Sequence, residues 1–442
     1  MAGQRLPEAP RGGVGVSTAL VANGFPEEEV RSRARLGAAA VFPAESGYGN
    51  GLLGAGPAPY APDRDDDLER IRIVPPVFMP ERLKKLIDLG REPLYSDVEL
   101  ETVIGGFTSR LPLYVSAFGS TQVASHHLGE AVGRQAARLG VPLVIGENVV
   151  PVNGYRDADG AGVTPLLGRI AAYAEAADDE HGGVALQQST EDADAEVWNL
   201  VYSDPVSEPL LATGRLAFEL KVGQGAKPGL GGLTVLDRDT AGRVAEQYAT
   251  DEVFGADSDR VLRASSPGTF TEEILRQQVR LMRNNFPRVK VWVKLHPGRD
   301  VALAAATAWA AGADAVTVDG AEGGTAWAPT GFLSHVGLPL ADCLRRVGRK
   351  DRCLLASGRM WEGTRAVKAL ALGARAVGLG RAALLAVDED REAGLRRLAE
   401  AFALETRMLT SAVGKYHVNA LDPEDLLLPA AWRMSPATSG AA

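Results

Sequence analysis

The sequence predicts an α/β fold, a closed parallel (β/α)8 (TIM) barrel with an N-terminal extension and a C-terminal helical tail. From Leu111 onward, short apolar runs alternate with longer helical segments, as expected for repeated β–α units. A glycine or small polar residue follows nearly every apolar run, where the turns at the mouth of a barrel would lie. The 442 residues exceed the roughly 250 that one barrel needs, which leaves room for extensions and insertions.

Eight apolar runs have the length and spacing of barrel strands. An open, doubly wound sheet would give a similar string of elements, but the motifs at the strand ends favour the closed barrel. The expected strands are Pro112–Ala117, Pro142–Gly146, Val184–Gln188, Ala217–Val222, Lys290–Leu295, Ala315–Asp319, Cys353–Ala356 and Ala376–Leu379.

Helical segments fill the gaps, because their apolar residues recur at spacings of three and four. The clearest are Ser125–Leu139, Glu272–Asn285, Val301–Ala311 and Thr364–Leu372, with a final helix over Arg391–Val413. The resulting divisions are an arm or lid (1–65), a lead-in (66–110), the barrel (111–387) and a C-terminal helix with its tail (388–442). Five glycines and three prolines between Ser46 and Pro62 favour irregular backbone, so a disordered tail competes with the lid interpretation of residues 1–65.

Composition narrows the function classes. The formal net charge of −9 gives no general attraction for nucleic acid or anionic membranes. Two cysteines, Cys343 and Cys353, are too few for an intrachain iron–sulfur cluster, and the six histidines show no metal-binding spacing. No apolar run approaches the ~20 residues of a membrane span, and no secretory leader is visible. We therefore expect a cytoplasmic protein without a metal site.

The ends of the sixth, seventh and eighth expected strands suggest a phosphate site. Glycine lets backbone amides approach an anion closely, and a following helix N-terminus adds further donors. Arginine can add charge-assisted hydrogen bonds. Tight turns alone would also explain any single glycine, but three neighbouring strand ends with this pattern favour phosphate binding. The residues concerned are Gly323, Gly324, Thr325, Ser357, Gly358, Arg359, Gly380 and Arg381.

Lys294 closes an otherwise apolar strand. Alternation puts Lys290, Trp292 and Lys294 on one face, but the pattern does not decide whether that face lines the barrel or meets solvent. Inside the mouth, the ammonium would stabilise negative charge on a reduced flavin ring. His296 follows it closely and is a candidate ligand contact.

The loop from Lys221 to Gly232 combines two lysines, a glutamine and five glycines in twelve residues after a strand. Such a loop could present amides and ammonium groups to a carboxylated substrate, whereas a solvated flexible loop is the alternative. Its sequence, Lys-Val-Gly-Gln-Gly-Ala-Lys-Pro-Gly-Leu-Gly-Gly, resembles the signature of the FMN-binding glutamate synthase family. Companion motifs follow in the family's order, and the similarity covers about residues 95–428. They are Ser116–Gly119, Glu147, Val293–Leu295, Gly320–Thr325 and Gly363–Leu370.

The resemblance implies an FMN-dependent oxidoreductase of glutamate synthase type. In that family, reduced FMN delivers hydride to the imine carbon of 2-iminoglutarate. Lys221, Gln224 and Lys227 would face the flavin and substrate, together with Lys294 as the fourth catalytic candidate. The residues expected around FMN are Ser116, Ala117, Glu147, Lys294, Gly323, Gly324, Thr325, Ser357, Gly358, Arg359, Gly380 and Arg381.

Two departures from the family pattern limit what the resemblance implies. The family holds an iron–sulfur cluster through cysteines after the eighth strand, and Ala382–Glu392 contains none. We also expect no glutaminase domain, so a separate protein would donate electrons or supply ammonia, and the carboxylated substrate need not be 2-oxoglutarate. Two alternatives stay open: a redox-neutral, isomerase-like FMN enzyme, and a flavin-binding subunit that exposes an apolar patch for a larger complex. We also expect a homo-oligomer.

Overall fold

The computed structural model describes most of the chain from residue 20 to residue 429. The described residues are 20–22, 24–42, 66–118, 128–146, 165–190, 195–223, 225–244, 249–255, 257–264, 266–323, 328–348 and 351–429.

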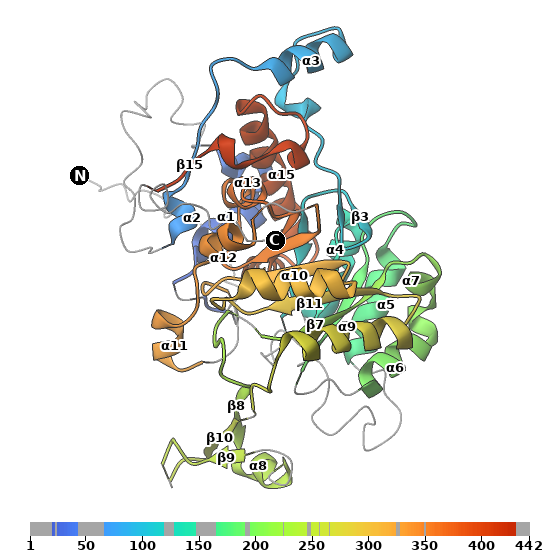
Figure 1. Cartoon of the computed structure of the whole chain (residues 1–442), viewed down its shortest axis with the longest axis vertical. Coiled ribbons are helices and arrows are strands. Elements are labelled where there is room, and N and C mark those ends of the chain that lie inside the picture. Colours follow the sequence, from blue (N-terminus) through green and yellow to red (C-terminus); the bar gives the residue numbers. More distant parts are fainter. Residues whose placement is uncertain are drawn as a thin grey trace, which may run out of the picture.

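Eight parallel strands close into a barrel, which confirms the predicted fold class (Figure 1). The order around the barrel is β11-β12-β13-β14-β4-β5-β6-β7, and every neighbouring pair is parallel. Each strand falls on an expected apolar run. In chain order they are β4 (Leu113–Val115), β5 (Leu143–Ile145), β6 (Val184–Ser189), β7 (Leu216–Lys221), β11 (Lys290–Leu295), β12 (Ala315–Asp319), β13 (Leu354–Ser357) and β14 (Ala376–Leu379).

Helices cover the outside of the barrel, and those named below, except α11, bury apolar side chains. Five of them fall on expected segments: α4 (Gly129–Leu139), α9 (Glu272–Asn285), α10 (Val301–Ala311), α13 (Gly363–Ala371) and α15 (Gly394–Ala412). The others are α5 (Pro165–Ala176), α6 (Ala195–Ser203), α7 (Glu208–Ala212), α11 (Thr330–His335), α12 (Leu340–Val347) and α14 (Arg381–Glu389).

A short hairpin, β2 (Thr102–Ile104) and β3 (Phe107–Ser109), closes the N-terminal end of the barrel. Phe107 packs against Trp292 with ring centroids 5.3 Å apart, and the Trp292 indole donates to the Gly105 carbonyl over 3.0 Å. Gly105 has φ +56° and no room for a side chain, because a Cβ there would lie 2.2 Å from Trp292 Nε1. The barrel is therefore filled at this end, and open space for a ligand has to lie at the other.

An insertion between β7 and α9 forms a separate three-stranded antiparallel sheet. Its strands β8 (Leu233–Asp237), β10 (Arg260–Ala264) and β9 (Ala249–Asp251) pair in that order, next to α8 (Arg238–Val244). Figure 1 shows this sheet projecting from one end of the molecule's long axis. The insertion starts directly after the Lys221–Gly232 loop, so it stands beside the mouth of the barrel.

The N-terminal segment packs against the C-terminal helices. Helix α1 (Glu27–Leu36) and the 3-10 turn η1 (Gly37–Val41) contact α14 and α15. After a short helix α2 (Asp67–Arg70), strand β1 (Arg72–Ile73) pairs with β15 (Leu426–Leu427). Short 3-10 turns complete the described part: η3 (Tyr95–Asp97), η6 (Pro205–Ser207), η7 (Val418–Ala420) and η8 (Pro423–Asp425). Since α1 rests on buried contacts, the part of residues 1–65 that is described belongs to the folded body.

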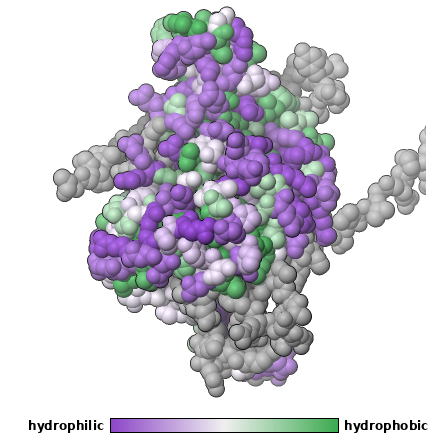
Figure 2. All heavy atoms as spheres, turned by 90° about the vertical axis from the view of Figure 1, so that its right-hand side faces the viewer, coloured by the Kyte–Doolittle hydropathy of each residue, from purple (hydrophilic) through white to green (hydrophobic). Residues whose placement is uncertain are grey.

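Helix α3 (Pro80–Leu89) projects at the opposite end from the small sheet and buries none of its residues (Figure 1). Its apolar side chains, with those just before it, are exposed: Phe78 is 86% and Ile87 is 70% accessible. Figure 2 shows apolar atoms gathered at this end of the surface. We call Val77, Phe78, Leu83 and Ile87 the α3 patch. Within the described residues, no helix has the length and apolarity to cross a membrane.

Candidate functional site

The barrel interior changes from apolar to polar towards the carboxyl ends of its strands. Trp292, Ala217 and Leu355 belong to the apolar layer above the β2–β3 hairpin. Two residues further along each strand, alternation brings polar side chains to the same inner face. They include Glu219 on β7, Lys294 on β11, Thr317 on β12 and Ser357 on β13. The mouth of the barrel is therefore a polar site built on an apolar floor.

Lys294 points into this mouth, because Trp292 on the same face of β11 belongs to the inner apolar layer. The side chain is only 9% exposed, and its Nζ lies 3.5 Å from Oδ2 of Asp319. This geometry decides between the two orientations that the sequence left open: Lys294 is not a solvated lysine.

Asp319, the last residue of β12, is the centre of the site. Its Oδ1 accepts from the Ser357 hydroxyl over 2.6 Å, and its Oδ2 accepts from the Gly225 amide over 2.9 Å. Burial alone would raise the pKa of Asp319, but the Lys294 ammonium and these hydrogen bonds outweigh burial and lower it. Asp319 is thus an anion at neutral pH that joins the signature loop to β11 and β13.

A second polar layer lies directly below. Glu219 accepts hydrogen bonds from the Gln187 side-chain amide and from the Thr317 hydroxyl, the latter over 2.9 Å. The Tyr114 phenol is buried nearby, and burial, with the charge of Glu219, raises its pKa, so it stays protonated. These groups form a buried polar layer beneath the upper lysine site.

Lys221 stands beside Lys294, since the two are register partners in the parallel pairing of β7 with β11. Lys221 is half-buried at the rim. Two lysines at one corner of the mouth favour a ligand that carries negative charge.

The Lys221–Gly232 loop folds over this corner rather than extending into solvent. Gly225 is packed so closely that a Cβ there would lie 2.0 Å from the Gly320 carbonyl oxygen. Gly223 lies against His296, whose pKa burial lowers, so this imidazole is neutral at pH 7. Lys227 is only 7% exposed and donates to the Leu233 carbonyl over 3.3 Å. The loop's ordered contacts argue against the flexible-loop alternative.

The ends of β13 and β14 have the features predicted for phosphate binding. Gly358 has φ +131°, and Arg359 has φ +52°, a conformation rare outside glycine and found preferentially at functional sites. Helix α14 begins at Arg381 without a side-chain cap on Gly380, and within the described residues no acceptor contacts the amides of Arg381, Ala382 and Ala383. A Cβ on Gly380 would meet only Ser116 Cβ, at 3.9 Å, so space is open there.

Arg359 and Arg381 both come near this helix start. Burial lowers the pKa of the Arg381 guanidinium, and the negative charge of Asp319, which acts to raise that pKa, only partly offsets the effect of burial. The Arg381 guanidinium donates to the Glu322 carbonyl, which fixes it beside the β12 turn. Two neighbouring guanidiniums, one of them on the first residue of an uncapped helix, favour an anion at this point.

The end of β4 closes the ring of candidate residues. Ser116 is buried, and Gly378 opposite it leaves room for its hydroxyl, since a Cβ there would lie 2.0 Å from Ser116 Oγ. Ala117 is half-buried next to the inner layer. Gly323 in the β12 turn approaches Asp319 so closely that a Cβ would lie 2.1 Å from its Oδ1. Four predicted site residues lie outside the described residues: Glu147, Gln224, Gly324 and Thr325.

Three residues with a clear place in this region were not among those predicted from sequence. Asp319 had a visible signal, a carboxylate ending an apolar strand between predicted ligand residues. Glu219 had the same signal in weaker form, as one acid within an apolar strand. Phe25 had none, because its place next to Arg359 and Arg381 depends on contacts across more than 300 residues of sequence.

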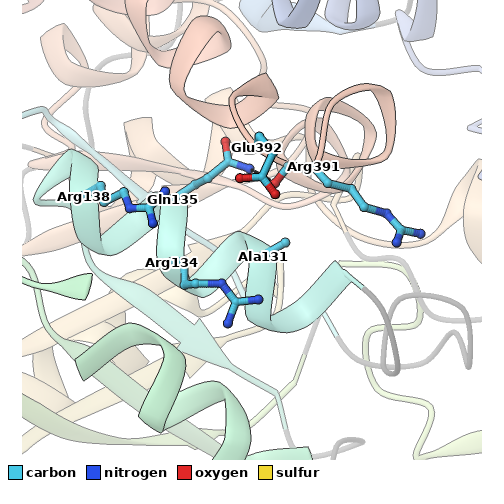
Figure 3. A pocket seen from close by; sticks show the side chains of 6 residues that line it. All are labelled: Ala131, Arg134, Gln135, Arg138, Arg391 and Glu392. Carbon is cyan, nitrogen blue, oxygen red and sulfur yellow. Dashed lines mark hydrogen bonds between the residues drawn. The ribbon is translucent and has the colours of Figure 1, made fainter. Parts of the chain in front are cut away.

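A surface pocket of about 170 Å³ lies outside the barrel, between α4 and the start of α15 (Figure 3). Gln135 holds the two elements together, because its side chain accepts from the Leu395 amide over 3.0 Å and donates to the Arg391 carbonyl over 2.8 Å. None of the predicted site residues contributes to the pocket, which is separate from the barrel mouth. Its lining residues are Ala131, Arg134, Gln135, Arg138, Arg391 and Glu392.

Comparison with known proteins confirms the resemblance carried by the motifs. A family model described as a conserved region in glutamate synthase matches residues 206–390, from η6 through α14. The archaeal glutamate synthase (NADPH) of Methanocaldococcus jannaschii is 34% identical over 194 residues, which cover 41% of this chain and 36% of that protein. A glutamate synthase large subunit-like protein of Rhizobium meliloti is 31% identical over 268 residues, or 48% of this chain and 58% of that protein. The matched regions thus span less than two thirds of these relatives.

Solved structures share the barrel at lower identity. A flavocytochrome b2 double mutant with sulfite bound gives a TM-score of 0.54 at 18% identity, covering 85% of this chain and 80% of that chain. The (S)-mandelate dehydrogenase of Pseudomonas putida, as a soluble mutant, gives 0.52 at 19% identity, covering 92% of this chain and 100% of that chain. A mandelate oxidase variant with a monooxide FMN adduct gives 0.50 at 19% identity, covering 82% of this chain and 88% of that chain. These likenesses establish the fold.

Proposed function

We propose that this chain is an FMN-dependent oxidoreductase of glutamate synthase type, acting on an amino acid, imino acid or related carbonyl compound that carries a carboxylate. One observation carries the proposal: Asp319 joins the amide of Gly225, in the signature loop, to the ammonium of Lys294. Three motifs that are far apart in the sequence thereby meet at the mouth of one barrel. The sequence similarity to glutamate synthases covers this same region.

The residues present fit FMN. The phosphate of FMN would be held by the uncapped amides at the start of α14 together with Arg359 and Arg381, and Gly380 leaves the space it needs. Lys294 would face the ring from the barrel interior, and Ser116, Ala117 and Ser357 would line the wall between the two ends. The FMN adduct in the mandelate oxidase variant shows that this fold accommodates the cofactor in that protein.

FMN, when bound, supplies the hydride chemistry, and the chain's own residues supply charge and orientation. The Lys294 ammonium, fixed by Asp319, stabilises negative charge at the ring. Lys221 at the rim binds the substrate carboxylate, with Gln224 and Lys227 as the other substrate contacts we propose. The Lys227 ammonium donates to the Leu233 carbonyl, so we expect it to act by holding the loop as well.

The α3 patch supports a second proposal, that this flavoprotein works as an oligomer or as part of a larger complex. Phe78 and Ile87 are among the most exposed apolar side chains of the described residues. A partner protein that donates electrons or supplies ammonia is compatible with this arrangement. We place the protein in the cytoplasm on the basis of its cysteine usage and expect neither nucleic acid nor a membrane as partner.

The first test is the visible absorption spectrum of the purified protein, with the released cofactor identified by mass. FMN in the protein, and bleaching of the flavin under anaerobic conditions with a carboxylated amine or a reductant plus an imine, is the expected result. Bound FMN that never changes redox state during turnover would favour the redox-neutral isomerase instead. A colourless protein that does not bind added FMN would contradict the cofactor assignment altogether.

A further inference from the structure

The N-terminal segment reaches the phosphate end of the candidate site through Phe25. The phenyl ring is 7% exposed. Its centroid lies 4.9 Å from Cζ of Arg381 and 5.9 Å from Cζ of Arg359. Both distances are within the range in which a guanidinium is attracted to the electron-rich face of an aromatic ring.

The backbone next to Phe25 contacts the same arginine. The carbonyl of Gly24 accepts a hydrogen bond from Nη1 of Arg359 over 2.6 Å. Arg359 itself has a left-handed backbone conformation that few residues other than glycine adopt. The direction of its guanidinium is therefore set from two sides, by the turn after β13 and by the N-terminal segment.

A network of ion pairs determines where Phe25 lies. Arg31 of α1 pairs with Asp388 at 3.0 Å and with Glu389 at 3.2 Å, both at the end of α14. Arg33 pairs with Glu405 of α15 at 3.0 Å. Both arginine side chains are less than 10% exposed, so these pairs are poorly screened by solvent. The segment is thus anchored to the helix whose opposite end offers the uncapped amides.

We propose that Phe25 is a positioning residue for the anion site: its ring holds Arg359 and Arg381 together at the start of α14, ready for the phosphate of FMN. Two guanidiniums at one point repel each other, and the negative face of an aromatic ring offsets part of that repulsion. Removing the ring lets the arginines separate, which weakens binding of the phosphate group and leaves binding of the flavin ring unchanged. This inference rests on the proposed function, since it takes FMN as the ligand.

The test compares FMN with riboflavin, which lacks the phosphate. Dissociation constants are measured by flavin fluorescence on the apoprotein of the full chain, for wild type, Phe25→Ala and Phe25→Leu. The Leu variant keeps apolar volume without a π face, which guards against loss of folding, and thermal unfolding is recorded for each. Phe42→Ala is the matched control, because Phe42 lies in the same segment and is 53% exposed.

We expect both Phe25 variants to bind FMN about tenfold more weakly, with riboflavin binding unchanged. Phe25→Tyr keeps the ring and should restore FMN affinity, and Phe42→Ala should match wild type. Equal weakening for FMN and riboflavin, or no weakening for either, would overturn the inference while leaving the FMN assignment intact. A wild-type protein that binds neither flavin would instead contradict the proposed function.

Discussion

The ammonium of Lys294 lies 3.5 Å from the carboxylate of Asp319, inside a barrel mouth where both side chains are less than 10% exposed. Three other polar contacts converge near this pair, from Ser357, from Gly225 and, one layer below, from the Glu219 network. The pair therefore has two roles, as a charge placed for chemistry and as a structural tie between strands and loop.

Replacing Lys294 with Met should separate these roles. We expect slower flavin reduction because the cation beside the ring is lost. We also expect the free energy of unfolding to fall by about 3–5 kcal/mol, since Asp319 is left as an uncompensated buried charge. Anaerobic stopped-flow reduction and urea unfolding measure the two effects.

The double variant Lys294→Met with Asp319→Asn is the control for that experiment. It should regain most of the stability, because no buried charge stays unpaired, yet keep the slow reduction. Wild-type reduction rates in the single Met variant would refute the role assigned to Lys294.

Gly358→Val should lower FMN occupancy of the purified protein. A side chain at φ +131° is strained, and its Cβ would lie 3.2 Å from the Gly320 amide nitrogen in the turn near the phosphate site. The ratio of flavin to protein absorbance reports occupancy. Gly348→Val is the control, since Gly348 also has positive φ but open space around it. Equal occupancy in the two variants would move the phosphate site elsewhere.

Gly105→Ala should destabilise the barrel strongly. The added Cβ would lie 2.2 Å from Trp292 Nε1 and would break the hairpin away from the barrel floor. We expect a loss of about 3 kcal/mol or more, combining overpacking with backbone strain. Gly90→Ala isolates the strain, because Gly90 has a similar φ of +66° with nothing within 4 Å. Urea unfolding of both variants checks the difference; equal losses would mean that the hairpin does not plug the barrel as described.

Glu322 makes stability depend on pH. Burial, and then the nearby charge of Asp66, raises the pKa of Glu322 from 4.5 to about 7. The folded state therefore binds the proton on Glu322 more tightly than the unfolded state does. The stabilisation that this gives is fully present below pH 4.5 and is lost as the pH rises through 7. The Glu322→Gln variant should lose less stability than wild type between pH 5 and pH 8. Identical pH profiles in urea unfolding would contradict this assignment.

The α3 patch should govern the oligomeric state. We expect wild-type protein to sediment as more than one chain, and Phe78→Glu with Ile87→Glu to shift it to a smaller species, because two charges would enter an apolar contact. Leu303→Glu on α10 is the matched control, since Leu303 is also exposed, at 53%, but lies on a different helix. Unchanged sedimentation of the α3 variant would exclude the patch as the interface between copies.

The sequence was sufficient for the barrel strands and for five of the helices, because the spacing of apolar residues and the length of a segment are local properties. All eight barrel strands lie on predicted runs, and α9 and α10 begin and end at the predicted residues. The prediction of a glutamate synthase-type FMN oxidoreductase agrees with the sequence comparisons. The small sheet β8–β10–β9 was not predicted, since its strands are only three to five residues long.

What the sequence could not supply was orientation. The alternation along β11 left two directions for Lys294, and only the position of Trp292 inside the closed barrel selects one. Asp319 was assigned to a strand end without a role, because its partners come from three other segments. The roles assigned to the individual site residues stay predictions until ligand-bound measurements are made.

The insertion that carries the small sheet also bears on how the molecule assembles. Residues 222–289 separate β7 from β11, whereas residues 296–314 separate β11 from β12. The first connection is about three and a half times as long as the second. Bringing its two ends together from the unfolded chain therefore costs about 1 kcal/mol more in chain entropy. We therefore expect β7 to pair with β11 later in folding than β11 pairs with β12. Lys221 and Lys294 face each other where β7 meets β11. An intermediate could thus hold nearly all of its secondary structure and still lack the paired lysines, so recovery of ligand binding would lag behind recovery of helical signal on refolding.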